Sequence, residues 1–345
     1  MPQPNCFTRL VAAAQARLAV PIAVYPGISL TGATVRDVVT DPAAQTAAQV
    51  ALHERYRTPA VLTAMDLSAE AEAFGCEIRV SETEVPTVTG RLVTSLEQAK
   101  SLHVPQPGDR RTAVYLETAR RLRQLPGRPL VLGGCIGPFS LAARLVGVSE
   151  AMELTLTEPE TVHALLEKTT AFLTAYAEAF RAAGADGLIM AEPAAGLLSP
   201  PSVAAFSSAY IRHIVQALED GHFALVLHNC GARLVQLPAV LEAGTSVVHF
   251  GAPMDLAAAL VRVDPAIVLC GNLDPTATFV RSSPEEVRVR VGQLLDAVQP
   301  HRNFVLSSGC DLPPDASLAN LDAFYAANRP QPSPWSRRST RGRAA

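Results

Sequence analysis

The alternation of short apolar runs with helical segments limits the possible folds of this chain more than any other feature. The runs are rich in β-branched residues, which indicates strands that are buried on both faces, as in a parallel sheet. Eight such runs lie at residues 20–25, 60–64, 129–133, 186–191, 223–231, 246–250, 266–270 and 303–307. The pattern predicts an α/β protein.

Helical segments fill most of the intervals between these runs. The pair Asp41-Pro42 is a start signal for one helix. The helices are predicted at residues 34–56, 112–125, 138–145, 159–183, 202–218, 234–243, 255–263 and 284–298. Eight strands that mostly alternate with helices are typical of a (β/α)8 TIM barrel, and we predict a closed barrel. A doubly wound open sheet is the competing architecture.

The interval between the second and third strands is the least regular part of the chain. Residues 69–75 have a helical pattern, and residues 76–80 with 86–93 would form either a small hairpin or an extended excursion. We therefore expect one domain over residues 1–328, with an excursion between strands two and three. Residues 329–345 hold five arginines, three prolines and no acidic residue, which predicts a disordered Arg/Pro-rich tail.

The composition excludes several classes of partner. Hydrophobic residues make up 48% of the chain and the formal net charge is -3, so neither a nucleic-acid nor an anionic-membrane partner is indicated. The N-terminus lacks the pattern of a signal peptide, and no apolar run is long enough to span a bilayer. We expect a cytoplasmic protein. Its six widely spread cysteines favour free thiols or metal ligands over disulfides.

Polar residues gather where the predicted strands end. In a (β/α)8 barrel the C-terminal ends of the strands form one mouth, and the active site lies there. In chain order these residues are Asp66, Cys135, Glu192, His228, Cys230, His249, Asn272, Asp274, Cys310 and Asp311. This gathering indicates a site at the mouth more strongly than any single motif does.

Three of these residues form a zinc donor set. Alternate side chains of a strand share a face, so His228 and Cys230 can point at one common atom. If Cys310 meets them, one His and two Cys would bind zinc and leave a fourth position for water or substrate. The competing interpretation is that buried Cys and His are ordinary core residues, and we assign Cys135 and Cys270 to the core on that ground.

The acidic residues allow more than one role. Glu192 follows an apolar run, where a buried carboxylate needs a partner, and it would be a fourth zinc ligand, a general base or an anchor for substrate. Asp274 precedes a proline and would simply cap the following turn. Asp311 would either orient a metal ligand or belong to a turn.

The chain resembles the uroporphyrinogen decarboxylase superfamily over residues 5–328. The motifs that carry the resemblance are AEAEAFGCE at 69–77, GPFSLA at 137–142, GADG at 184–187, EPAAGLLSP at 192–200, HNC at 228–230, GNLDP at 271–275 and SGC at 308–310. The resemblance implies a (β/α)8 barrel. Within the superfamily, the chain is most similar to the methylcobamide:coenzyme M methyltransferase branch.

Three differences from true decarboxylases point to that branch. The Arg-containing motif of decarboxylases is replaced by VYPGI at 24–28, and their Phe-Ser-Asp-like motif by TAMDLS at 63–68. Their Gly-His near the last strand is Gly309-Cys310 here. The resemblance implies zinc ligands at His228, Cys230 and Cys310, with Glu192 only a possible fourth.

The resemblance also implies the reaction, in which a zinc-bound thiol such as coenzyme M takes a methyl group from a methylated corrinoid. No cobalamin-binding Asp-x-His-x-x-Gly pattern occurs in the chain, so a separate corrinoid protein would carry the methylcobalamin. We assign Glu192 and Asp311 to catalysis. Asp66, Asn272 and Asp274 are assigned to binding the corrinoid.

Other activities stay open at this point. The direction of methyl transfer is not determined by the sequence. A metal-independent decarboxylase of tetrapyrrole biosynthesis is the alternative enzyme, although it leaves the His/Cys/Cys set unexplained. A non-catalytic corrinoid- or tetrapyrrole-binding protein is the third possibility.

Overall fold

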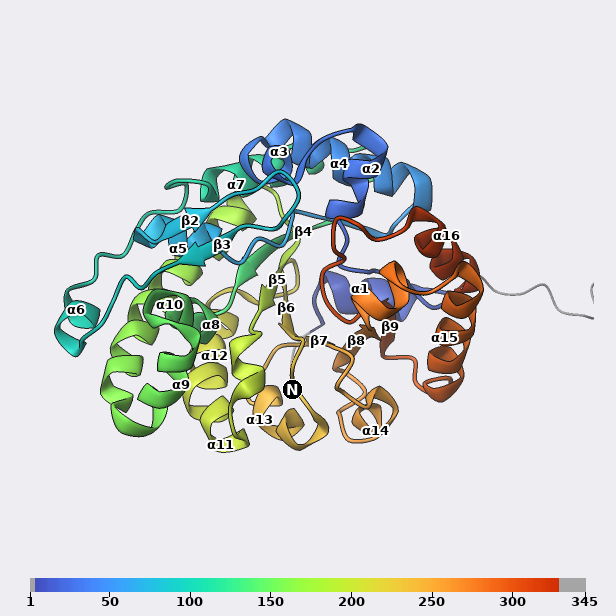
Figure 1. Cartoon of the computed structure of the whole chain (residues 1–345). Helices are drawn as coiled ribbons and strands as arrows, with labels where there is room; N and C mark the ends of the chain where they lie inside the picture. Colours follow the sequence, from blue (N-terminus) through green and yellow to red (C-terminus); the bar gives the residue numbers. More distant parts are fainter. Residues whose placement is uncertain (1–3, 329–345) are drawn as a thin grey trace, which may run out of the picture.

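A parallel sheet of seven strands forms the centre of the protein (Figure 1). The computed structural model describes residues 4–328, so the predicted tail at 329–345 lies outside the described residues. In spatial order the strands are β1 (Ala60–Leu62), β4 (Leu130–Ile136), β5 (Gly187–Ala191), β6 (Ala224–Asn229), β7 (Val247–Phe250), β8 (Val268–Leu273) and β9 (Phe304–Ser308). These seven correspond to the second to eighth predicted strands, and all neighbouring pairs are parallel.

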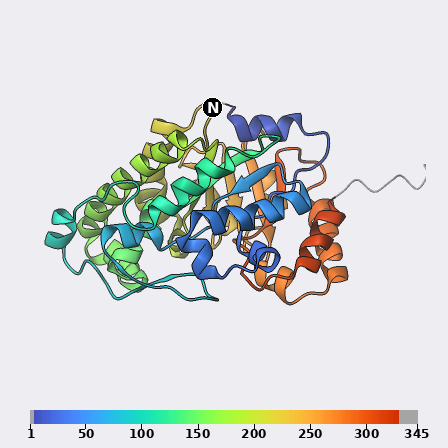
Figure 2. The same ribbon diagram turned by 90° about the horizontal axis from the view of Figure 1, so that it is seen from above.

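Helices lie outside the curved sheet on the views of Figures 1 and 2. The α-helices are α1 Cys6–Ala13, α2 Ile28–Thr31, α3 Val35–Thr40, α4 Pro42–Tyr56, α5 Ala69–Phe74, α6 Leu96–Ser101, α7 Thr112–Leu122, α8 Pro138–Val146, α9 Val148–Thr157, α10 Pro159–Ala182, α11 Pro200–Val203, α12 Ala209–Leu218, α13 Leu237–Leu241, α14 Leu256–Leu260, α15 Pro284–Ala297 and α16 Leu318–Ala327. Shorter 3-10 or π turns are η1 Tyr25–Gly27, η2 Ala194–Leu197, η3 Ala204–Ser208, η4 Leu234–Gln236 and η5 Pro275–Val280.

Local sequence signals explain where these helices begin. The Asp41 side chain accepts a hydrogen bond from the Ala43 backbone N–H at 2.8 Å and caps α4, whose first residue is a proline. Ser283 and Glu286 form a reciprocal capping box at the start of α15. The predicted start at Asp41-Pro42 is therefore confirmed. None of the helices in residues 4–328 is both long and apolar enough to cross a membrane.

The prediction of a strand at residues 20–25 is wrong. Only Ala19 forms a bridge, to Leu306 of β9, and the Val20 N–H donates to the Leu306 carbonyl at 2.9 Å. Pro21 has no N–H to continue the pairing, and the chain enters the short turn η1 at Tyr25. The predicted closed eight-stranded barrel is therefore not confirmed.

The sheet stays open between β9 and β1, and we call this gap the seam. Two buried glutamines lie on the β1 side of the seam. The free edge of β1 needs acceptors for its backbone N–H groups. The Gln49 side chain accepts from the Leu62 N–H at 3.2 Å, and the Gln45 side chain accepts from the Ala64 N–H at 3.0 Å. Side chains of α4 thus accept the hydrogen bonds of the backbone N–H groups along the edge of β1, where a closed barrel would place an eighth strand.

The segment between β1 and β4 contains the one antiparallel strand pair of residues 4–328. Strands β2 (Glu77–Arg79) and β3 (Thr87–Thr89) form a two-stranded sheet, which confirms the hairpin alternative. The same segment holds α5, α6 and α7. The predicted helix at 202–218 is instead divided into α11, the π turn η3 and α12.

Candidate metal centre

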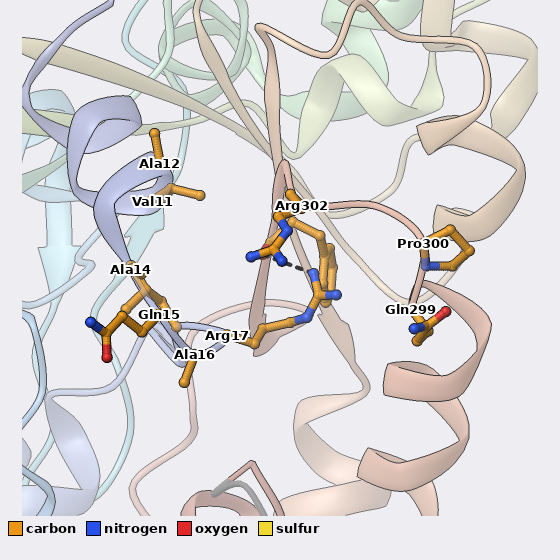
Figure 3. A pocket seen from close by; sticks show the side chains of 11 residues that line it. Val11, Ala12, Ala14, Gln15, Ala16, Arg17, Gln299, Pro300 and Arg302 are labelled. Carbon is orange, nitrogen blue, oxygen red and sulfur yellow. Dashed lines mark hydrogen bonds between the residues drawn. The ribbon is translucent and has the colours of Figure 1, made fainter.

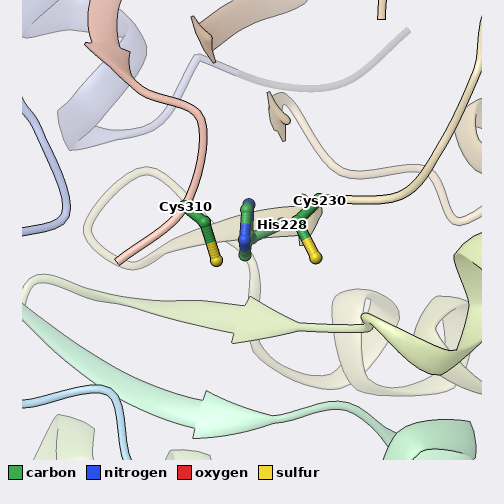
Figure 4. Close-up of side chains that lie close together, drawn as sticks. All are labelled: His228, Cys230 and Cys310. Carbon is green, nitrogen blue, oxygen red and sulfur yellow. The ribbon is translucent and has the colours of Figure 1, made fainter. Parts of the chain in front are cut away.

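The three predicted metal ligands lie together at the C-terminal ends of two strands. His228 is the second-to-last residue of β6, Cys230 follows that strand, and Cys310 follows β9. One possible ligand atom from each residue lies within 4.8 Å of those of the other two. The two thiol groups flank the imidazole and point to the same side of it (Figure 4). The fold thus joins two segments that are distant in the sequence.

His228 has one nitrogen in use and one free. Its Nδ1 atom is 2.8 Å from Nδ1 of His249 on the neighbouring strand β7. Its Nε2 atom is buried and has no hydrogen-bond partner within residues 4–328. Leaving a buried polar atom without a partner costs about 1–3 kcal/mol. A bound metal ion would remove that cost, so the free Nε2 fits a ligand role.

The two cysteines are half-buried and interact with each other. The pKa of the Cys230 thiol is lowered, chiefly because the Cys310 thiol donates a hydrogen bond to its thiolate. The same contact raises the pKa of Cys310. A site with one thiolate already favoured, a second thiol and a free imidazole nitrogen has the soft donors that Zn²⁺ prefers. The residues present therefore fit a zinc ion with three protein ligands.

Close backbone packing holds Cys230 in place. A Cβ atom added to Gly251, just after β7, would lie 2.0 Å from the Cys230 carbonyl oxygen. Only glycine permits this approach, because real Cβ atoms do not come so near to another atom. The loop after β7 therefore fixes the backbone of the second ligand.

Glu192 lies at the end of β5 and is fully buried. Its Oε1 atom accepts from the Phe139 N–H at 2.9 Å, and its Oε2 atom accepts from the Ser140 N–H at 3.0 Å and the Ser140 hydroxyl at 2.7 Å. Burial raises the pKa of Glu192 to about 7 although these hydrogen bonds oppose the shift. Both oxygens thus cap the N-terminus of α8, and Glu192 does not belong to the metal-ligand group of the described chain.

Asp311 directly follows the third metal ligand. Its Oδ1 atom is buried and finds no hydrogen-bond partner in the described part of the chain. Burial raises its pKa well above the ordinary value for a carboxyl, while a hydrogen bond from the Leu312 backbone lowers it. Asp311 is therefore a carboxyl group with a free oxygen beside the cluster.

Asp66 is surrounded by donors from its own chain. Its Oδ2 atom accepts from the Arg111 guanidinium and from the Tyr115 hydroxyl, the latter at 2.7 Å. Its Oδ1 atom accepts from the backbone N–H of Ser68 at 2.9 Å and from the Ser68 hydroxyl at 2.6 Å. Arg111 also contacts Glu72 at 2.6 Å. This buried network joins α7 to the segment after β1.

The two remaining predicted site residues also have internal contacts. The Asn272 amide donates to the carbonyl oxygens of Gly251 and Met254, at 3.0 and 2.7 Å, and so holds the loop after β7 against β8. Asp274 is exposed, and its side chain accepts from the Ala277 N–H at 2.6 Å. The alternative that Asp274 caps the following turn is therefore confirmed.

Sequence reasoning gave no role to three polar residues that the structure places in these networks. Arg111 directly precedes α7 and resembles any surface arginine in the sequence, but it is 8% exposed and bound to Asp66. His249 and Ser307 lie inside apolar strands. The sequence analysis placed His249 at the mouth but gave it no role. A polar residue within an apolar strand is the signal that would have identified Ser307, because burial requires it to have a partner.

A separate pocket of about 380 Å³ lies where β9 begins, away from the ligand-bearing strand ends (Figure 3). Arg17 lines it and donates to the carbonyl oxygens of His301 and Phe304, at 2.8 and 3.3 Å. Its guanidinium also lies over the Phe304 ring, 5.3 Å from the centroid. We interpret Arg17 as a structural residue that holds the turn before β9.

Comparison with known proteins gives matches over most of the chain. The methylcobamide:CoM methyltransferase MtbA of Methanosarcina acetivorans is 31% identical over 266 residues, which are 76% of this chain and 77% of that protein. A uroporphyrinogen decarboxylase of Psychromonas ingrahamii is 27% identical over 292 residues, with 80% and 81% coverage. The structure of a methyltransferase from Methanosarcina mazei matches with a TM-score of 0.84, over 94% of this chain and 98% of that one.

At 24% identity the structural match shows a common fold and nothing further. The family follows from a different comparison. The family model described as uroporphyrinogen decarboxylase (URO-D) matches residues 25–330, which is most of the sequence. The chain therefore belongs to the uroporphyrinogen decarboxylase (URO-D) family.

Proposed function

We propose that this protein is a zinc-dependent methyltransferase that moves a methyl group from a methylated corrinoid to a small thiol such as coenzyme M. The observation that carries the proposal is the cluster of His228, Cys230 and Cys310, in which a buried imidazole nitrogen has no partner within residues 4–328. The relatives named methylcobamide:CoM methyltransferase support the same reaction class. A corrinoid protein would be the partner that brings the methyl group.

The chemistry follows from the donor set. A zinc ion held by His228, Cys230 and Cys310 would supply a Lewis acid that makes a bound thiol a thiolate at neutral pH. The acceptor sulfur forms a bond to the methyl carbon as the cobalt–carbon bond of the substrate corrinoid breaks. The electron pair of the broken bond stays on cobalt, and the thiol proton must pass to a base.

Asp311 is our candidate for that base. It directly follows Cys310, and its buried Oδ1 atom has no partner in the described part of the chain. Glu192 has both oxygens bound to the start of α8, which supports a role in holding the strand end more than a role as a ligand. Asp66 and Asn272 are engaged in contacts within the chain, and their proposed roles in corrinoid binding stay predictions.

Metal analysis tests the proposal directly. The wild type purified without chelator should contain about one zinc per chain, because one cluster of this kind occurs in residues 4–328. Cys310→Ala should lose the metal and remain folded. Cys135→Ala is the matched control, since that buried cysteine lies outside the ligand group and should leave the zinc content unchanged.

An activity assay completes the test. Wild type should demethylate methylcobalamin in the presence of coenzyme M, and Cys310→Ala should not. A wild type without zinc would refute the metal mechanism. Conversion of uroporphyrinogen by the wild type and by Cys310→Ala alike would instead identify a decarboxylase, and binding of cobalamin without turnover would identify a binding protein.

A further inference from the structure

A chain of buried hydrogen bonds leads from the first ligand to the N-terminal segment. His228 Nδ1 lies 2.8 Å from His249 Nδ1, and His249 Nε2 lies 2.8 Å from the Ser307 hydroxyl oxygen. That hydroxyl donates to the Val20 carbonyl oxygen at 2.7 Å. The chain thus crosses from β6 through β7 and β9 to the segment that packs beside β9.

The last acceptor of this series of hydrogen bonds determines which atom donates in each of them. A carbonyl oxygen only accepts hydrogen bonds, so the single proton of the Ser307 hydroxyl is used by Val20. The hydroxyl oxygen must then accept, which places a proton on Nε2 of His249. A neutral His249 with that proton has a lone pair on Nδ1, and the proton between the two rings therefore belongs to Nδ1 of His228.

The last step leaves His228 Nε2 as a lone pair. This is the atom that is buried without a partner in the described chain. An imidazole that carries its proton on Nδ1 is ready to bind a metal through Nε2, whereas the other tautomer would first have to move that proton.

We propose that His249 and Ser307 are positioning residues that hold the His228 proton on Nδ1 and keep Nε2 free for the metal. The inference rests on the proposed zinc site and deepens it. It assigns a function to two residues that touch neither the metal nor the substrate.

Burial makes this arrangement stable. His228, His249 and Ser307 are 1%, 2% and 0% exposed, so water does not compete for their polar atoms. The two rings meet edge to face, with centroids 4.6 Å apart and planes at 78°. Because His228 and His249 are also directly paired in the β6–β7 register, the strand backbones fix both the distance and the direction of the contact.

The test measures zinc affinity by competition with a chromophoric chelator. His249→Phe keeps a ring of similar size but removes both nitrogens, and Ser307→Ala removes the hydroxyl. Both variants should bind zinc about 10–100-fold more weakly than the wild type, which is the usual effect of losing a group that orients a metal ligand. Ser307→Thr keeps the hydroxyl and should restore wild-type affinity.

A matched control and a spectrum separate positioning from general destabilisation. Cys270→Ala removes a buried side chain from β8, opposite His249 in the register, without breaking the hydrogen-bond chain. It should leave the zinc affinity unchanged. With Co²⁺ in place of zinc, Ser307→Ala should alter the ligand-field bands that report imidazole coordination, while the thiolate charge-transfer band remains.

The outcomes also distinguish this inference from the proposed function. If the wild type binds zinc and folded Ser307→Ala and His249→Phe bind it equally well, the positioning role is refuted and the zinc site stands. If His249→Phe fails to fold, Ser307→Ala with its threonine rescue decides. A wild type that binds no zinc overturns the proposed function and this inference together.

Discussion

Replacement of Glu70 by glutamine should change how the stability of the protein depends on pH. Glu70 lies in α5 and is 1% exposed. Its Oε1 atom accepts from the Ile136 N–H at 3.1 Å, while its buried Oε2 atom has no partner within residues 4–328. Burial raises the pKa of Glu70 to about 8. The folded protein therefore keeps this proton at neutral pH.

The size of the effect follows from the two pKa values. A glutamate in the unfolded chain has a pKa of about 4.3, so between pH 4.3 and 8 the folded state binds a proton that the unfolded state has lost. The free energy of unfolding then falls as pH rises, by at most about 1.4 kcal/mol per pH unit from this group. Over the two pH units from 5.5 to 7.5 the ceiling is about 2.7 kcal/mol.

Denaturant unfolding at several pH values measures this slope. Glu70→Gln cannot ionise, so its stability relative to the wild type should rise steadily from pH 5.5 to 7.5. Glu77→Gln is the matched control for the loss of a carboxyl group as such, because Glu77 lies exposed on β2. A constant difference between wild type and Glu70→Gln over this range would show that Glu70 ionises in the folded protein, contrary to the argument from burial.

Two further substitutions test contacts around the site. Arg111→Met should cost about 3–5 kcal/mol in the free energy of unfolding, because it leaves the buried Asp66 carboxylate without its cation. Arg121→Met on the exposed face of the same helix is its control, and equal losses would contradict the buried network. Gly251→Ala should lower both the melting temperature and the zinc affinity, since its Cβ would displace Cys230. Gly292→Ala in α15 meets no atom within 4 Å, and similar behaviour of the two variants would refute this steric reasoning.

The sequence was sufficient to predict the strands that bear ligands. Each is a buried run that ends in a polar residue, and parallel strands bring those ends to one edge, so the meeting of Cys310 with His228 could be expected. The assignment of the order and direction of β4 to β9 needed only the alternation with helices.

The gap between β9 and β1, where helix side chains replace a strand, could not be predicted in the same way. Gln45 and Gln49 look like ordinary polar positions of a helix, and no pattern shows that their amides replace a strand at the edge of β1. The pairing of Asp66 with Arg111 could likewise not be predicted, because it depends on a contact between residues 45 positions apart. Such side-chain contacts leave no periodic trace in the sequence.

The bond between Ser307 and the Val20 carbonyl has a consequence for how the protein is made. Val20 is synthesised before Ser307, with 287 positions between them. Contacts of this length form slowly, because the entropy cost of closing a long loop must be met before the contact stabilises the fold. The orientation of the first ligand and the arrival of Cys310 therefore both need the chain to be synthesised through residue 310. Partly synthesised chains would not acquire the finished site, so zinc loading during translation would report that the N-terminal segment has docked beside β9.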